Sequence, residues 1–459
     1  MVKDNYKKYK QLRNKYIFFT FEGYSISETQ DSLEVVYNFN LNDRFHFFPS
    51  LKILKKSIIK NQLSFSEIEN FIFHIGLIEL ISYWKAACPP KIIIKPFRLS
   101  KEQIAWWKKI YFKGLGEFFY VNNIKCSVDD FVEIIVDSEK EICNAEYKVE
   151  GKKVLIPVGG GKDSIVTLEL LKERFQTIPF ILNPKPASIN TIKVAGFKDD
   201  ELMEIQRTIH PQLLELNDKG FLNGHTPFSA LLAFVSILAA ALTGSRHIAL
   251  SNEVSANEPT EKATGVNHQY SKSFEFEKDF REYVSKFITP DINYFSFLRP
   301  MNEYGIARLF SRFPEYLPVF KSCNIGSKTD SWCCKCPKCL FVFIILSPFI
   351  DKDELIKVFG KDIFQDPDLL KYFDELTGKS IVKPFECVGT IDEVNLAVME
   401  SIKKRRHHLP YLLEYYKSLP EYGKYQNFKK KRVTQSFEEN HFLNKKFLDI
   451  LKSAKCTNN

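Results

Sequence analysis

The chain has 459 residues, 44% of them hydrophobic and 26% charged, which are the values of a globular protein with two or three domains. This composition excludes wholesale disorder and fibrous repeats. The net charge of +9 resides in residues 401–459, which hold 14 Lys or Arg against 5 Asp or Glu, while the first 400 residues are balanced. A uniformly basic nucleic-acid-binding protein is thereby excluded, and we expect no stable nucleic-acid partner.

Residues 1–148 predict an N-terminal α+β domain. Over residues 17–55, aromatic and polar residues alternate between turn residues, which indicates short antiparallel strands. Ser64 and Glu67 then form a capping-box pattern ahead of apolar residues at helical spacing. A second helix is expected over Lys101–Phe119.

The character of the sequence changes over residues 149–350. Strands are predicted at three apolar runs, with a helix over Ile165–Phe175 between the first two: Lys153–Val158, Thr177–Leu182 and Arg246–Ser251. Strands that alternate with helices indicate a parallel α/β sheet. Residues 351–459 predict a helical C-terminal region that ends in the basic tail.

The longest uncharged stretch does not predict a membrane span. Phe228–Leu242 is rich in Ala and is preceded by polar residues, so we expect a buried helix and no transmembrane segment. No signal sequence opens the chain, which favours a cytoplasmic protein. Its ten cysteines should then be reduced or metal-bound and not paired in disulfides.

The most specific motif is a glycine loop between an expected strand and an expected helix: Gly159, Gly160, Gly161, Lys162, Asp163 and Ser164. Backbone N–H groups in such a turn, together with the amino end of a helix, form a site for phosphate oxygens. The Lys and Ser side chains can add direct contacts. The loop is not a Walker A motif, because Ile156 holds the first Gly position and Asp163 follows the lysine.

This loop resembles the PP-loop of the ATP pyrophosphatase superfamily, usually written Ser-Gly-Gly-x-Asp-Ser. Gly159 stands where that superfamily usually has Ser, so one phosphate hydrogen bond is expected to be missing or supplied elsewhere. The resemblance implies an adenine nucleotide α-hydrolase-like fold for residues 149–350. It also implies cleavage of ATP to AMP and diphosphate, commonly through an adenylated substrate.

Four cysteines have the spacing of a metal site: Cys323, Cys333, Cys336 and Cys339. Four thiolates at this spacing can surround one tetrahedral Zn²⁺, and four protein ligands leave no open position, so the role would be structural. Cys334 is expected to be a spare thiol. The alternative is a set of reduced cysteines without metal.

Polar residues also follow the expected strands, where open α/β sheets bind ligands. Ser251, Asn252 and Glu253 can hold Mg²⁺ or ligand hydroxyls, or belong to a solvated loop. Asn183, directly after the preceding strand, is grouped with them as a candidate nucleotide contact. His225 lies just before the Ala-rich helix, either as a site residue or as a helix-cap contact.

Taken in order, a set of segments resembles one family, the UDP-N-acetyl-α-D-muramoyl-L-alanyl-L-glutamate epimerases, over roughly residues 20–400: Tyr83–Pro89, Gly159–Ser164, Ser251–Glu258, Asn267–Lys272, Arg299–Pro300, Cys323–Cys339 and Lys383–Gly389. The resemblance implies conversion of the terminal L-Glu of UDP-MurNAc-L-Ala-L-Glu to D-Glu in peptidoglycan precursor synthesis. ATP and Mg²⁺ would be used, with release of AMP and diphosphate. The partner would thus be a small-molecule substrate.

Epimerisation needs a base on one face of the α-carbon and an acid on the other. The candidates, among which the sequence does not choose, are His225, His268, Glu386 and Cys387. Three basic residues are expected to bind carboxylate or diphosphate oxygens, with Arg best suited to bidentate contact: Lys272, Arg299 and Lys383.

Two other functions stay open from the sequence. The four cysteines and the basic tail also fit a PP-loop enzyme that modifies nucleobases or tRNA. A regulatory ATP- or AMP-binding module, with the tail docked on an anionic surface, is the non-enzymatic alternative. The intact Lys162, Asp163 and Ser164 favour an active site over an inactive one. The basic tail also fits the solvent-exposed faces of terminal helices, and the sequence does not indicate the oligomeric state.

Overall fold

The computed structural model describes residues 3–58, 63–144, 149–261, 265–380, 382–405 and 408–456. Its strands are β1 (Phe18–Glu28), β2 (Ser32–Leu41), β3 (Phe45–Phe47), β4 (Ser50–Leu54), β5 (Lys91–Ile94), β6 (Glu133–Val136), β7 (Glu150–Pro157), β8 (Gln176–Leu182), β9 (Met203–Thr208), β10 (Ser245–Leu250) and β11 (Asn293–Ser296). Its helices up to the sheet's last strand are α1 (Tyr6–Lys15), α2 (Phe65–Trp84), α3 (Lys101–Gly114), α4 (Gly116–Val121), α5 (Lys162–Lys172), α6 (Pro186–Val194), α7 (Pro211–Asp218), α8 (Phe228–Thr243) and α9 (Phe274–Phe287). The later helices are α10 (Glu303–Phe310), α11 (Pro337–Leu346), α12 (Lys352–Phe359), α13 (Leu370–Thr377), α14 (Ile391–Arg405), α15 (Tyr411–Lys417), α16 (Pro420–Gln426), α17 (Lys431–Thr434) and α18 (Lys445–Cys456).

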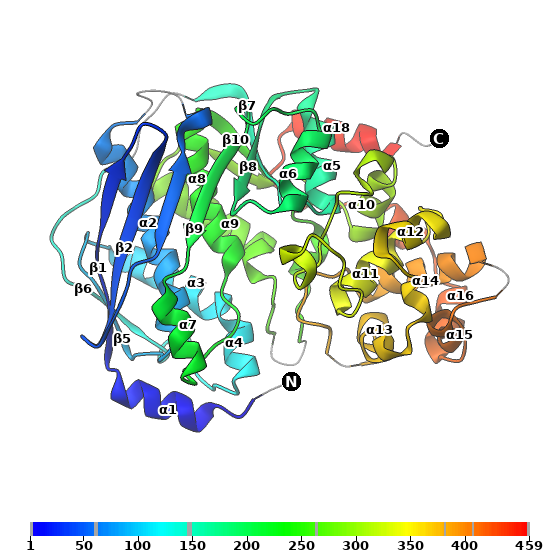
Figure 1. Ribbon diagram of the computed structural model, residues 1–459, viewed down its shortest axis with the longest axis horizontal. Coiled ribbons are helices and arrows are strands. Elements are labelled where there is room, and N and C mark those ends of the chain that lie inside the picture. Colours follow the sequence, from blue (N-terminus) through cyan, green and yellow to red (C-terminus); the bar gives the residue numbers. More distant parts are fainter. Residues whose placement is uncertain are drawn as a thin grey trace.

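One mixed sheet joins the strands in the order β11-β10-β7-β8-β9-β4-β2-β1-β5-β6, with β3 beside β2 (Figure 1). The run from β11 to β9 is parallel, as the alternating strands and helices predict. Strands β4, β2 and β1 are antiparallel, as the pattern of residues 17–55 predicts. Leu51 pairs with Arg207 and Ile53 with Ile205, which attaches β4 to β9. The sheet therefore continues across residue 148, where the sequence analysis places a domain boundary.

Both faces of the parallel strands are covered by helices, which explains their uninterrupted apolar runs. On β7, Leu155 packs in the core that includes α2, α3, α8 and α9. Its neighbours Val154 and Ile156 point to the opposite face, into a core shared with α5, α10 and α11. A mixed α/β sheet with a helical C-terminal region is thus confirmed.

Local sequence signals account for several helices. The Ser64 side chain accepts a hydrogen bond from the Glu67 backbone, and α2 begins with the predicted capping box. The helix expected over Lys101–Phe119 is in fact two, α3 and α4, which meet at Leu115. The predicted Ala-rich helix is α8, and most of its residues are buried in the protein core. Among the described residues, no helix combines the length and the apolar character that crossing a bilayer demands.

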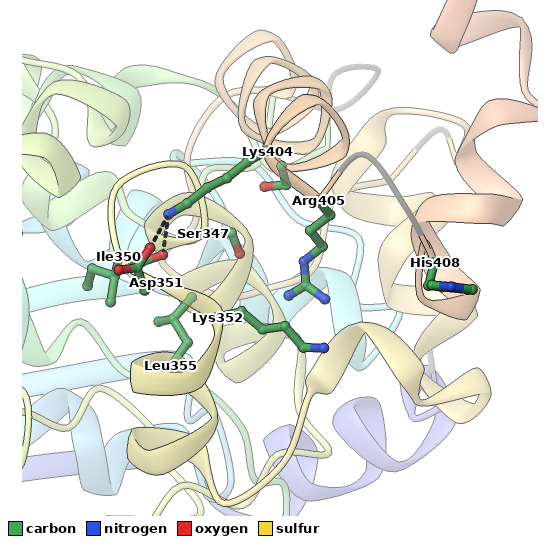
Figure 2. A pocket seen from close by; sticks show the side chains of 9 residues that line it. Ser347, Ile350, Asp351, Lys352, Leu355, Lys404, Arg405 and His408 are labelled. Carbon is green, nitrogen blue, oxygen red and sulfur yellow. Dashed lines mark hydrogen bonds and ion pairs between the residues drawn. The ribbon is translucent and has the colours of Figure 1, made fainter.

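The basic tail packs onto the body through its apolar side chains. Phe447 of α18 stacks on Phe175, with ring centroids 4.6 Å apart, and Leu451 is fully buried. Some basic side chains near the start of the tail are paired, and Figure 2 shows Lys404 directed at Asp351. These two residues line a hollow of about 280 Å³. This hollow shares no residue with the predicted site.

Candidate functional site

The glycine loop lies between β7 and α5, and its geometry requires glycine at one position. Gly160 has φ +84°, and a Cβ there would lie 2.7 Å from the carbonyl carbon of Ala187. Gly161 is the N-cap of α5, and the Ser164 hydroxyl donates to its carbonyl at 2.9 Å. A Cβ on Gly159, by contrast, meets nothing within 4 Å. There is thus room for the serine that PP-loops usually carry at this position.

Lys162 is buried at the start of α5 and pairs with two carboxylates, Asp163 and Glu303. Burial lowers the pKa of the amine, but the two carboxylates outweigh it and raise the pKa above its usual value. The lysine therefore keeps its positive charge at neutral pH. Its two partners hold it in the position where the loop could present a charge to a phosphate.

The predicted polar residues lie at the carboxyl ends of the parallel strands, at the same edge of the sheet as the loop. Ser251 donates to Thr167 of α5 at 2.8 Å, and Asn252 donates to Ser296 at 3.1 Å. Asn183 follows β8 with φ +59°, and its side chain accepts a hydrogen bond from the Arg207 backbone. Asn183 thus ties β8 to β9, a positioning role in addition to any nucleotide contact.

Three buried glutamates gather beside the loop, of which the sequence analysis singled out only Glu253. Burial raises the pKa of Glu253, and the charges of Glu393 and Asp163 raise it further. Burial likewise raises the pKa of Glu303 and of Glu393, which also interact with each other. Glu393 is fixed by hydrogen bonds from Thr390, at 2.7 Å from its backbone and 2.8 Å from its hydroxyl. These carboxylates lie beside Asp163 and carry oxygen atoms of the type that Mg²⁺ prefers, but Asp163 and Glu303 are both paired with the Lys162 amine in this structure.

A thiol, an amine and an imidazole meet in a second group. The Lys272 amine lies 3.0 Å from the Cys387 sulfur. Burial raises the pKa of this thiol, but Lys272 and His268 outweigh it and lower the pKa to about 5. Burial lowers the pKa of His268, but hydrogen bonds with Cys387 and Glu117 raise it to about 9. At neutral pH the group is therefore a thiolate beside an imidazolium.

Glu117, in α4, is a site residue that the sequence analysis missed. Its carboxylate accepts from His268 and lies 3.4 Å from Nδ1 of His225. The two imidazole rings are 4.6 Å apart, and burial and His268 lower the pKa of His225 to about 4. One ligand atom from each of these three residues lies within 4.8 Å of the others, so the trio could also hold a divalent metal.

The segment from residue 383 to 389 carries Cys387 and is held at several points. The Lys383 amine donates to Glu258 at 2.8 Å and to the Gly389 carbonyl at 2.9 Å. Lys338 of α11 donates to the Cys387 carbonyl. Glu386 accepts from Asn324 at 3.0 Å, and burial raises its pKa. The segment thus brings the predicted residues Lys383, Glu386 and Cys387 to the same region as Lys272 and His268, and Lys338 is a further residue that contacts it.

Arg299 is the exception, because it does not line an open site. It is fully buried, and its guanidinium donates to the backbone carbonyls of Glu253 and Lys272 and pairs with Glu277 at 2.9 Å. The expectation that it grips the substrate is therefore corrected. Its hydrogen bonds connect the two segments that carry Glu253 and Lys272, so Arg299 holds these segments in position and does not itself face the site.

The four predicted cysteines converge at the start of α11, with their sulfur atoms within 4.8 Å of one another. The sulfur of Cys339 lies 3.4 Å from that of Cys336 and 3.7 Å from that of Cys333. A tetrahedral zinc with Zn–S bonds of about 2.3 Å requires sulfurs roughly 3.8 Å apart. Backbone N–H groups also point at the sulfurs, as from Gly326 to Cys323 at 3.1 Å. The predicted spare thiol, Cys334, instead contacts the Phe359 carbonyl at 3.1 Å.

Comparison with known proteins places this chain in a family. The family model described as the MurL N-terminal domain matches residues 10–297, and that of the MurL C-terminal domain matches residues 319–428. No solved structure matches significantly.

Three curated relatives carry the name UDP-N-acetyl-alpha-D-muramoyl-L-alanyl-L-glutamate epimerase. The protein of Xanthomonas oryzae pv. oryzae is 35% identical over 326 residues, 69% of this chain and 70% of that protein. Those of Salinispora tropica and a Micromonospora species are 37% and 34% identical over 325 residues, 69% of this chain and 70% and 71% of theirs. The chain therefore belongs to the MurL family of epimerases.

Proposed function

We propose that the protein epimerises the terminal L-Glu of UDP-MurNAc-L-Ala-L-Glu to D-Glu, with cleavage of ATP to AMP and diphosphate, in peptidoglycan precursor synthesis. The names of the relatives support the substrate. The observation that carries the mechanism is the place of Lys272. Its amine contacts the Cys387 sulfur and also interacts electrostatically with Glu253 and Asp163 beside the glycine loop. Lys272 thus links the thiolate to the acidic residues beside the glycine loop.

Activation by ATP has a physical purpose in this reaction. Removing a proton next to a carboxylate creates an anion beside an existing negative charge. Transfer of AMP from ATP to the carboxylate releases diphosphate, removes the carboxylate charge and makes the α-proton more acidic. After epimerisation, attack of water on the acyl carbon would break the acyl–phosphate bond, release AMP and restore the carboxylate. The glycine loop and the amino end of α5 suit the diphosphate that leaves, as in the PP-loop fold that we propose for this part of the chain. Mg²⁺ held by Asp163, Glu253 and Glu303 would neutralise phosphate charge.

Cys387 and His268 suit the two proton transfers. A thiolate whose pKa is about 5 is a weak base, which fits a reaction whose α-proton has first been made more acidic. The protonated His268, held by Glu117, can return a proton to the α-carbon. Lys272 keeps the thiol ionised, and Lys383 holds the segment that carries it. We assign the base to Cys387 and the acid to His268 for formation of D-Glu.

We also propose a structural zinc at the four cysteines. The short sulfur–sulfur distances and the N–H groups directed at sulfur support a tetrathiolate site. Bound there, zinc would fasten the loop after Cys323 to the start of α11. Lys338 extends from that helix to the Cys387 carbonyl, so the zinc site would steady the catalytic segment without taking part in the chemistry.

The test is one assay with purified protein, Mg-ATP and UDP-MurNAc-L-Ala-L-Glu in deuterated water. We expect AMP, D-Glu after hydrolysis, and deuterium at its α-carbon. Lys162→Ala should abolish AMP formation, whereas Cys387→Ser should abolish epimerisation and α-deuteration. Cys334→Ser is the matched control and should keep full activity. Only L-Glu and no AMP from folded protein would refute the proposal, and AMP formation that needs RNA would favour a tRNA-modifying enzyme.

A further inference from the structure

A large cavity is lined by residues that neighbour the thiol and imidazole group in the chain. It has a volume of about 1020 Å³ and lies between the α3–α4 corner, the segment around residues 265–275 and the chain near residue 440. Gly116 and Asn267 line it, and they directly neighbour Glu117 and His268 in the chain. The backbone that carries Glu117 and His268 therefore borders the cavity, whereas no residue of the glycine loop lines it.

Aromatic rings connect the cavity to the reacting group. Tyr120 lines the cavity, and its ring lies 5.5 Å from that of Phe385. The ring of Phe385 is in turn 6.4 Å from that of His268, and Phe385 lies two residues before Cys387. A ligand that fills the cavity could thus extend one end past this pair to the sulfur of Cys387.

The walls have the composition of a site for a polar ring compound. Phe119, Tyr120 and Phe274 offer apolar faces, and Asn267 offers an amide. Tyr270 is only 5% exposed, and its hydroxyl has no hydrogen-bond partner among the described residues. A buried hydroxyl without a partner carries a free-energy cost that a ligand can relieve.

The cavity carries charges of both signs. Lys113, Lys125, Glu275 and Glu438 line it, and Lys113 pairs with Glu275 at 2.6 Å. Lys125 is exposed, and within the described part of the chain it forms no ion pair. Its amine is therefore available to an anionic group of a ligand.

We propose that this cavity binds the uridine diphosphate end of the substrate. The inference rests on the proposed function, because a glutamyl residue alone would leave most of the volume empty, while the sugar and the uridine diphosphate of the same substrate must extend away from the reacting group. Uracil would stack on the aromatic wall, with Tyr270 and Asn267 as hydrogen-bonding groups. The diphosphate would lie near Lys125, and the peptide would extend past Phe385. ATP would occupy the separate site at the glycine loop.

The test is a calorimetric titration of the full-length protein with UDP, which measures the Kd. We expect UDP to bind, with a Kd raised at least about tenfold in Lys125→Ala and in the shape-conserving Tyr270→Phe. Lys357→Ala removes an exposed lysine from α12, which contributes nothing to the cavity, and should bind UDP as the unaltered protein does. Lys162→Ala should also keep UDP binding while losing ATP binding.

Different results separate this inference from the proposed function. Absence of UDP binding, or UDP binding that is unchanged in both cavity variants, would overturn the cavity assignment even if the epimerase assay succeeds. UDP binding that is lost in Lys162→Ala would place the nucleotide at the glycine loop and overturn it as well. Cavity-dependent UDP binding by a protein that fails the epimerase assay would uphold the site and refute only the reaction.

Discussion

Replacing Lys272 by Met should raise the pKa of the Cys387 thiol, because the positive charge of the lysine stabilises the thiolate. The amine lies 3.0 Å from the sulfur. At that separation and an effective dielectric constant of about 20, two unit charges attract by about 5.5 kcal/mol, which corresponds to about 4 in pKa. Water that replaces the amine, and the remaining charge of His268, reduce this effect. We therefore expect the pKa to rise by at least about 2, from about 5 to about 7 or above.

The pH dependence of alkylation by iodoacetamide measures this pKa. Mass spectrometry of the peptide that contains Cys387 separates its reaction from those of the other nine among the ten cysteines. Because the thiolate is the reactive form, alkylation of the unaltered protein should set in near pH 5 and that of Lys272→Met near pH 7 or above. Lys272→Arg keeps the charge and is the matched control, with an onset near that of the unaltered protein.

The epimerase activity should follow the same shift. Lys272→Met should lose most of its activity at pH 7 and recover part of it at higher pH, where the thiol ionises without help. An alkylation onset that is the same in the unaltered protein and in Lys272→Met would refute the reasoning, since the lysine would then not control the thiol. An onset raised equally by Lys272→Arg would show that shape, and not charge, is the cause.

Three further outcomes follow from the structure. Gly160→Ala should lose ATP turnover and more than about 1 kcal/mol of stability, because residue 160 has a positive φ and its Cβ would lie 2.7 Å from the Ala187 carbonyl carbon. Gly159→Ser should keep both the turnover and the stability. Equal effects of the two substitutions in thermal unfolding and in AMP assays would contradict this. Cys336→Ser should lose its zinc, as measured by elemental analysis, and more than about 2 kcal/mol of stability, whereas Cys334→Ser should keep its zinc. If neither variant contains zinc, the proposal of a zinc site is refuted. Arg299→Leu should destabilise the protein by about 3 to 5 kcal/mol in denaturant unfolding, because Glu277 is left buried without its partner. Unchanged stability together with a raised KM would instead show that Arg299 binds the substrate.

Where signals in the sequence are local, they predict the structure well. The strand, glycine loop and helix from β7 to α5 are adjacent in the chain, and their residues determine each other's conformation directly. The capping box at Ser64 and the apolar run of α8 are equally local. The same holds for the four cysteines, three of which lie within seven residues.

Where long-range packing decides, the sequence gives little warning. Glu117 resembles any charged residue on the exposed side of a helix, and it enters the site only because α4 lies beside His268, 151 residues further along the chain. Arg299 before a helix resembles an anion ligand, but its partner Glu277 from α9 buries it. The pairing of β4 with β9, which makes the sheet continuous, was likewise not predictable, because nothing in the sequence of either strand indicates its partner.

The attachment of β4 to β9 has a consequence for how the chain acquires its structure during synthesis. Ile53 must wait for Ile205, about 150 residues later, before that edge of the sheet is paired. At translation rates of roughly 5 to 20 residues per second, the open edge persists for about 8 to 30 seconds. An unpaired strand edge is a template for pairing with other chains. The nascent protein therefore passes through a period in which its N-terminal strands are open to intermolecular association, and this period ends only when the central strands of the sheet have emerged.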